Sequence, residues 1–145
     1  MAGKKVNVTA RWTGALRFEA ASEAGAAVRM DSLPGASAST PMELALMALA
    51  GCTGMDVVDI LAKKRQPAES IEIRVSGARA EDHPRVYTEI DLEYILSGKA
   101  LTPEAVARSI ELSITKYCSV GGMLAKTAAI RTSFRIVPPE ETPHE

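Results

Sequence analysis

The sequence has few of the residues that many functional classes need. Its 145 residues include only two cysteines, two histidines and six aromatic residues. Neither a CxxC nor an HxxxH pattern occurs, and no glycine-rich phosphate loop or nucleophilic-serine motif is present. His83 precedes a proline in a predicted turn and His144 is next to last, so a zinc site is disfavoured. We therefore expect neither a metal nor a cofactor, and a core built from aliphatic residues.

The sequence also lacks an excess of charge of either sign and a long apolar run. Seventeen basic residues against eighteen acidic ones give a net charge of −1, so no basic field for nucleic acid exists. The uncharged run from Leu44 to Met55 is shorter than the roughly 20 residues that span a bilayer. The N-terminus has two lysines but no apolar signal core. We expect a cytoplasmic protein that binds neither membrane nor nucleic acid, with free, metal-bound or redox-active cysteines.

The segment from Thr40 to Arg65 is predicted to be the central helix. Thr40 caps it, Pro41 suits the first helical position, and Glu43 completes a capping box three residues after the cap. From Leu44 to Cys52 no residue is charged, which indicates a helix buried on every side. One small sheet cannot cover such a helix. We therefore expect an obligate homodimer in which a second subunit supplies the remaining cover.

Alternation of apolar and polar residues predicts six strands around this helix. Their ranges are 6–12, 16–20, 28–30, 71–76, 86–96 and 130–136. The first three form an antiparallel meander. Thr102-Pro103-Glu104 opens a second helix, and a third is predicted from Ser119 to Thr127. This order indicates one α+β domain over residues 1–137, followed by a polar, proline-rich and flexible tail over 138–145.

The two cysteines occupy different local settings. Cys52 lies in mid-helix between Gly51 and Gly54, and each glycine costs roughly 1 kcal/mol there, so something is expected to approach the backbone closely. A buried structural thiol would also explain Cys52. Cys118 follows Lys116 at a helix N-terminus, where the dipole and the cation favour a thiolate, although a small core residue at a helix junction is the alternative. Since 66 positions separate the cysteines, spacing alone does not show whether they meet.

Two carboxylates flank Cys52 along the helix. Glu43 is nine residues earlier, about 13 Å along the axis and nearly opposite in phase, so it cannot touch Cys52 within its own helix. The capping box accounts for Glu43 without any catalytic role. Asp56 lies one turn beyond Cys52 and is expected to point to solvent. A carboxylate held against the thiol would instead raise its pKa.

Several motifs together resemble the OsmC/Ohr family, and within it the YhfA-like branch rather than Ohr itself. They are Pro41-Met42-Glu43-Leu44, then Met47-Ala48-Leu49-Ala50-Gly51-Cys52 with Met55-Asp56-Val57-Val58 behind it, and Lys116-Tyr117-Cys118-Ser119-Val120. The resemblance covers nearly the whole chain. It implies an OsmC-like α+β fold, with two antiparallel sheets around long buried central helices in an intertwined homodimer.

The resemblance also implies an activity. Characterised members of the family are thiol peroxidases that reduce small organic hydroperoxides in oxidative-stress defence. Carried across, Cys52 is the peroxidatic cysteine and Cys118 the resolving one, and an external lipoyl-type dithiol restores both. Apolar surroundings favour an organic peroxide over hydrogen peroxide.

The chain departs from the family pattern in its supporting residues. The family's catalytic carboxylate follows the helix-starting proline directly, where this chain has Met42. Glu43, one position later, is rotated by about 100° and is the candidate to replace it. The arginine that pairs with this carboxylate belongs to the N-terminal strands, where Arg11, Arg17 and Arg29 are candidates and Arg29 is preferred.

Two further interpretations use the same features. In the first, the protein is not an enzyme and holds a small hydrophobic ligand in the apolar dimer cleft, because the carboxylate after Pro41 is missing. In the second, it is a hot-dog-type thioesterase, whose fold also wraps a long apolar helix in antiparallel strands. The paired cysteine motifs count against the second interpretation, since a thioesterase does not need them.

Overall fold

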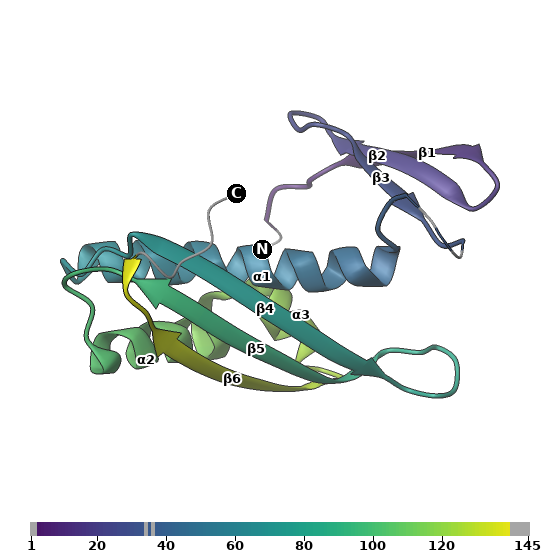
Figure 1. The fold of residues 1–145 in the computed structure, drawn as a ribbon. Coiled ribbons are helices and arrows are strands. Elements are labelled where there is room, and N and C mark those ends of the chain that lie inside the picture. The colour runs from purple at the N-terminus through teal and green to yellow at the C-terminus, as the bar shows by residue number, and fades with distance from the viewer. Residues whose placement is uncertain (1–2, 34, 36, 140–145) are drawn as a thin grey trace. The chain divides into compact units, whose positions relative to one another are not determined.

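The computed structural model describes residues 3–33, 35 and 37–139 in two compact units, residues 1–45 and 46–145. The boundary falls inside the first long helix, α1 (Pro41–Lys63) (Figure 1). Most of the tail predicted at 138–145 lies outside the described residues.

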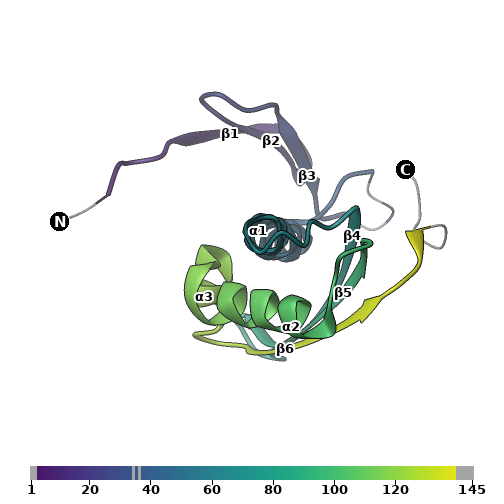
Figure 2. The same ribbon diagram turned by 90° about the vertical axis from the view of Figure 1, so that its left-hand side faces the viewer.

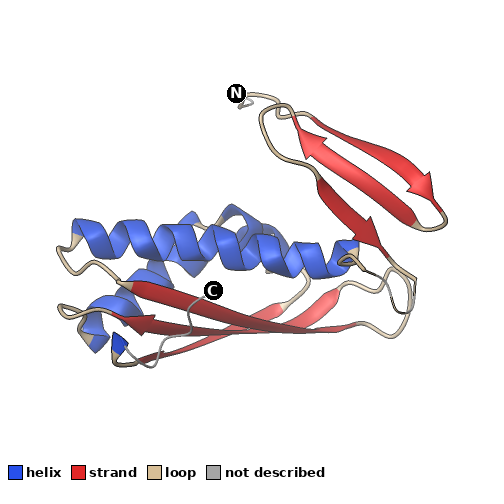
Figure 3. Ribbon diagram, turned by 45° about the horizontal axis from the view of Figure 1, so that its top comes forward, coloured by secondary structure: helices blue, strands red, loops and turns tan. Residues whose placement is uncertain are grey.

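The first unit contains a three-stranded antiparallel sheet (Figure 3). Strands β1 (Val8–Gly14), β2 (Arg17–Ser22) and β3 (Val28–Asp31) are hydrogen-bonded in the order β1-β2-β3. The predicted meander is therefore confirmed. Trp12 lies opposite Phe18, which lies opposite Met30. Since residues directly opposite share a face, these side chains make one face of the sheet apolar.

The second unit contains a mixed sheet. Strands β4 (Ser70–Arg79), β5 (Tyr87–Ser97) and β6 (Ala129–Ile136) are ordered β4-β5-β6. β4 and β5 are antiparallel, as a short turn requires, but β5 and β6 are parallel. The expectation of two wholly antiparallel sheets is therefore wrong for this pair. The reason is the helical crossover between β5 and β6, which returns the chain to the end of the sheet from which β5 started.

The helices of the second unit lie on one face of this sheet (Figure 2). After β5 come α2 (Pro103–Leu112), one π-helical turn η1 (Ser113–Tyr117) and α3 (Ser119–Leu124). The predicted cap of α2 is confirmed, because the Thr102 hydroxyl accepts the Ala105 N–H at 3.3 Å. The third helix ends three residues earlier than predicted, at Leu124.

The core of the second unit lies between α1, α2 and the sheet. α1 buries one stripe, Leu49, Thr53, Val57 and Leu61, at a spacing of four residues. The aliphatic core that composition predicts also contains two tyrosines, Tyr87 and Tyr94. On another side of α1, the Met55 side chain is 75% exposed and Val58 49% exposed. One chain therefore does not bury α1 on every side.

Candidate functional site

The fold brings the two cysteines together within the second unit. Cys52 projects from the middle of α1 and is half-buried, whereas Cys118 immediately precedes α3 and is 4% exposed. Both thiols are free, and they are close enough for the Cys52 thiol to raise the pKa of Cys118. Two candidate residues 66 positions apart thus form one dithiol site.

The backbone around Cys118 holds its thiol in place. The Cys118 N–H donates to the Ser113 carbonyl oxygen at 2.7 Å, which closes the π turn. The Cys118 Sγ accepts the Gly121 N–H at 3.3 Å. A Cβ added to Gly121 would lie 3.3 Å from that Sγ and 3.5 Å from Leu49 Cδ1. Glycine at position 121 therefore lets α3 approach both the thiol and α1 closely.

The two glycines of α1, Gly51 and Gly54, have different surroundings. A Cβ on Gly54 would meet Ile73 Cδ1 at 3.0 Å, so a close approach exists there as expected. A Cβ on Gly51 would meet nothing within 4 Å among the described residues. The expectation of a close neighbour at Gly51 is therefore not met within the described chain, because the helix side that carries Gly51 is open.

Burial has the largest effect on the pKa of the Cys118 thiol. Desolvation is the largest of the effects that together raise the pKa of this thiol to about 11; the Gly121 N–H lowers the pKa, while the Cys52 thiol and the charge of Asp56 raise it. The expected thiolate at this helix start is therefore wrong. The neighbouring cation does not reverse the effect, since the Lys116 ammonium lies over the Tyr117 ring, 5.2 Å from its centroid. Cys118 is a protonated thiol at neutral pH.

A buried hydrogen-bond chain runs beside the thiols. Thr53, which follows Cys52, shares its hydroxyl with Tyr94 Oη at 2.8 Å and Ser113 Oγ at 2.7 Å. Ser113 Oγ donates to the Asp56 carboxylate at 2.9 Å. This bond corrects the expectation that Asp56 points to solvent. Thr53, Ser113 and Tyr94 are fully buried, so the chain satisfies hydroxyls that would otherwise be costly to desolvate.

The Asp56 carboxylate at the end of this hydrogen-bond chain determines where the hydroxyl protons lie. A carboxylate only accepts hydrogen bonds, so Ser113 uses its one hydroxyl proton in the hydrogen bond to Asp56. Thr53 must then donate to Ser113, and Tyr94 must donate to Thr53. Burial raises the pKa of Tyr94 to about 12, with Cys118 and Asp56 adding to the shift, which keeps that donor protonated. Sequence reasoning missed Thr53, Tyr94 and Ser113, and the only signal was a threonine within the apolar stripe of α1.

The remaining candidates belong to the first unit. Glu43 forms the predicted capping box: its carboxylate accepts the Thr40 N–H at 2.8 Å, and its own N–H donates to Thr40 Oγ1 at 3.1 Å. Arg11 lies opposite Glu19, which lies opposite Arg29. Arg17, two residues before Glu19 in β2, shares the same sheet face. Strand register therefore does not single out one of the three arginines.

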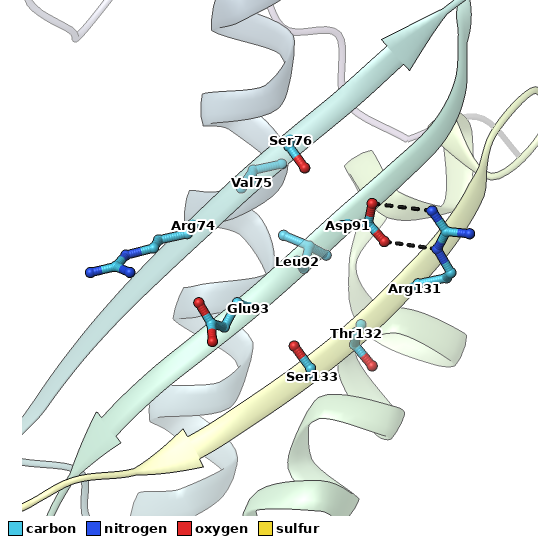
Figure 4. Close-up of a pocket in the computed structure, with 9 residues that line it drawn as sticks. All are labelled: Arg74, Val75, Ser76, Asp91, Leu92, Glu93, Arg131, Thr132 and Ser133. Carbon is cyan, nitrogen blue, oxygen red and sulfur yellow. Dashed lines mark hydrogen bonds and ion pairs between the residues drawn. The ribbon is translucent and has the colours of Figure 1, made fainter.

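A separate groove of about 290 Å³ lies on the sheet face turned away from the helices (Figure 4). Asp91 accepts two hydrogen bonds from Arg131, at 2.7 and 3.2 Å, which lowers the pKa of that carboxyl. Arg74 is paired with Glu72 at 2.7 Å and Glu93 with Arg135 at 3.4 Å. Because these charges neutralise one another, the groove offers no reactive group. Among the described residues, no cluster of three or more potential metal ligands occurs.

These features define a class of protein: a two-sheet α+β fold with a paired-thiol site beside a long apolar helix. The family model described as "OsmC-like protein" matches residues 34–133, a range that includes both cysteines. The chain is a member of the OsmC-like family.

Its relatives support the same placement. The chain is 42% identical over 127 residues to Protein YhfA of Escherichia coli K12, covering 88% of this chain and 95% of that one. The crystal structure of an OsmC-like protein from Mycoplasma pneumoniae superposes with a TM-score of 0.82 at 18% identity, covering 94% and 99% of the two chains. The organic hydroperoxide resistance protein OhrB of Bacillus subtilis gives a TM-score of 0.63 at 17% identity, covering 91% and 98%.

Proposed function

We propose that this protein is a cysteine-based peroxidase that reduces organic hydroperoxides in oxidative-stress defence. The observation that carries the proposal is that the half-buried Cys52 thiol and the buried Cys118 thiol are neighbours in the folded chain. Such a pair performs two-electron chemistry without a metal or cofactor. The OsmC-like family supports the proposal, since OhrB of Bacillus subtilis bears the name of a hydroperoxide resistance protein.

Cys52 makes the first attack because it is the more accessible of the two thiols. Its thiolate attacks the terminal peroxide oxygen and the O–O bond breaks. The alcohol leaves after taking up a proton, and Cys52 becomes a sulfenic acid. Cys118 is unsuited to this step, since its raised pKa keeps it protonated.

Cys118 then resolves the intermediate. Its sulfur attacks the sulfenic sulfur of Cys52, the S–O bond breaks, and the departing hydroxide takes the Cys118 proton to form water. The product is a Cys52–Cys118 disulfide. An external dithiol supplies two electrons and two protons to restore both thiols, which closes the cycle.

The supporting residues come from the first unit. Glu43 has its carboxylate on the Thr40 N–H and cannot reach Cys52 within its own helix, so in the proposal it supports the thiolate of the other subunit across the homodimer. One of Arg11, Arg17 and Arg29 pairs with it; we retain Arg29 as the preferred candidate. An apolar peroxide is favoured because the surroundings of Cys52 in α1 are aliphatic, with the buried Leu49 one turn before it.

The test is peptide mass spectrometry of the reduced protein after one equivalent of cumene hydroperoxide. We expect a Cys52–Cys118 disulfide within seconds. Cys52→Ser should consume no peroxide, whereas Cys118→Ser should consume it once and accumulate sulfenic acid on Cys52. Two thiols that remain reduced after minutes in the wild-type protein would overturn the proposal.

We also propose that the functional form is a homodimer. The α1 side that carries Met55 and Val58 forms, with Ile71 and Ile73 of β4, an apolar groove of about 520 Å³. No other element among the described residues of the second unit covers this side. Val58→Glu should place a charge in the interface and yield a smaller species by sedimentation velocity. Ser133→Glu, on the charged outer face, is the matched control. A wild-type protein that sediments as a folded monomer at micromolar concentration argues against the dimer.

The same groove supports a second candidate, a binding protein for a small hydrophobic ligand. Its lining is mostly aliphatic, with Gly54 and Ala62 leaving room between the larger side chains. Organic extraction of the purified protein followed by mass spectrometry should release a stoichiometric lipid if this hypothesis holds. Thiols that are also slow toward peroxide would favour it over the peroxidase. Membership of the OsmC-like family counts against the hot-dog thioesterase hypothesis.

The proposed location is the cytoplasm, where a reducing environment keeps both thiols available. By length and composition alone α1 would suffice to cross a membrane, a test that core helices of soluble proteins also pass. Thr53 and Asp56 of α1 make hydrogen bonds to Tyr94 and Ser113, which a lipid-facing helix would not make. A cell fractionation in which the protein follows a soluble marker would agree with this assignment.

A further inference from the structure

Three links connect Cys52 to Cys118 through Thr53 and Ser113. Cys52 is joined to Thr53 by the peptide bond, and the Thr53 hydroxyl bonds Ser113 Oγ at 2.7 Å. The Ser113 carbonyl oxygen accepts the Cys118 N–H at 2.7 Å, and the Cys118 thiol is a neighbour of the Cys52 thiol. Ser113 thus contacts α1 through its side chain and Cys118 through its backbone. The position of one thiol relative to the other depends on the bond between Thr53 and Ser113.

The π turn makes this connection possible. In a continued α-helix the Ser113 carbonyl would accept the N–H of residue 117. Here it accepts the N–H of Cys118, one residue further, and the helix ends there. The turn is anchored at its first residue, where Ser113 also donates to Asp56. Such π turns occur often at functional sites because they redirect one side chain.

Packing alone does not explain why position 53 is a threonine. Its neighbours in the buried stripe of α1, Leu49 and Val57, are aliphatic, and a valine would fill a similar space. A buried hydroxyl is costly unless it is hydrogen-bonded, and Thr53 has partners from two other elements, Tyr94 of β5 and Ser113 of η1. The hydroxyl therefore has a role that valine would not fill.

We propose that the buried chain of Tyr94, Thr53, Ser113 and Asp56 positions Cys118 for disulfide formation with Cys52. Thr53 and Ser113 are positioning residues: they do not touch the reacting sulfurs through their hydroxyls but hold the turn that carries Cys118. The resolving role of Cys118 rests on the proposed peroxidase function. The positioning itself concerns only the formation of the disulfide, whatever oxidant removes the electrons.

The first experiment measures disulfide formation without a peroxide. Diamide accepts two hydrogens from the reduced protein and leaves the Cys52–Cys118 disulfide and a hydrazine. Thr53→Val should slow this closure about tenfold, because displacing reacting groups by roughly 1 Å costs up to a hundredfold. Thr53→Ser keeps the hydroxyl and should restore closure to within about twofold of wild type. Closure of Thr53→Val at the wild-type rate would overturn the proposal.

A pair of serines separates positioning from general stability. Ser113 and Ser109 lie about one helical turn apart and both are fully buried. The Ser109 hydroxyl donates to the Ala105 carbonyl oxygen at 2.7 Å, within α2. Ser113→Ala should slow closure by diamide, whereas Ser109→Ala should leave it unchanged. Equal slowing in both variants would show a loss of stability rather than of positioning, and would contradict the inference.

The second experiment uses cumene hydroperoxide and follows the fate of Cys52. When closure is slow, the sulfenic acid meets a second peroxide and becomes sulfinic acid. Thr53→Val should therefore raise the sulfinic fraction on the Cys52 peptide while its initial peroxide consumption stays at the wild-type rate. If the wild type ignores peroxide but closes with diamide in a Thr53-dependent way, the peroxidase proposal fails and the positioning inference stands. If the protein consumes peroxide but its closure does not depend on Thr53, the positioning inference fails and the peroxidase proposal stands.

Discussion

Cys118 Sγ accepts the Gly121 N–H at 3.3 Å while the Cys118 side chain is 4% exposed. The amide favours the thiolate, but desolvation is the larger effect, so the pKa of Cys118 rises to about 11. Cys52, its half-buried neighbour, is left as the accessible thiol of the pair. This asymmetry gives the two cysteines different chemistry and leads to the predictions below.

The two thiols should differ in their rate of alkylation. At pH 8 a thiol with a pKa of about 11 is ionised in about one molecule in a thousand, and the Cys118 side chain is also shielded from solvent. Iodoacetamide should therefore modify Cys52 well before Cys118 in the reduced protein. Timed quenching and peptide mass spectrometry measure the order. Unfolding in urea is the control, since it should make the two rates similar.

Stability should fall at high pH through Cys118. Its pKa is about 9 when unfolded and about 11 when folded, so between these values the unfolded chain binds fewer protons than the native one. The free energy of unfolding should then decrease by up to about 1.4 kcal/mol per pH unit, and this contribution is fully present below pH 9. Urea unfolding of reduced wild type and Cys118→Ser at pH 8 and 10.5 tests the sign. A difference between the two proteins that does not change with pH would refute the assignment.

Adjacent glycines of α3 should respond oppositely to alanine. At Gly121 the added Cβ would lie 3.3 Å from Cys118 Sγ, a tight contact, so Gly121→Ala should destabilise the fold and slow disulfide closure. At Gly122 a Cβ would meet nothing within 4 Å among the described residues. Gly122→Ala should therefore stabilise by about 0.5–1 kcal/mol, because alanine has less backbone entropy to lose. Urea denaturation of both variants gives the comparison, and equal shifts would contradict it.

Glu43→Gln should separate capping from catalysis. Glutamine also completes a capping box, so the free energy of unfolding should change by less than about 0.5 kcal/mol. If the Glu43 carboxylate supports the thiolate as proposed, peroxide consumption should fall at least about tenfold, as loss of a charged partner entails. Thr40→Ala is the matched variant, which should cost about 1 kcal/mol of stability by removing the cap. A fully active Glu43→Gln protein would leave Glu43 with its capping role alone.

Most of the helices and strands were predictable from local sequence patterns. The cap at Thr40, the proline that opens α2 and the alternation in β4 and β5 each depend on residues within a few positions of one another. The direction of β6 did not follow from any local pattern, because strand direction depends on how the crossover returns to the sheet. The tyrosines of the core were also missed, since composition does not reveal which of the few aromatics are buried.

The candidate site was predictable in its parts but not in its assembly. The motifs around Cys52 and Cys118 identify both residues, and the structure brings them together. The prediction of a Cys118 thiolate was wrong because it considered only the helix end and Lys116. The burial of the Cys118 thiol does not follow from the neighbouring residues in the sequence. The expectation that Asp56 faces solvent failed for a related reason, since its partner Ser113 is 57 positions away.

The sequence by itself determined which segments form helices and strands, which helix is apolar, and which two thiols are available. These properties follow from spacings of two to four residues and from the chemistry of single side chains. Only the tertiary structure decided that the two thiols are neighbours, that Cys118 stays protonated, and that Thr53 links α1 to the π turn. These properties depend on desolvation and on hydrogen bonds between distant segments, which exist only once the chain has packed.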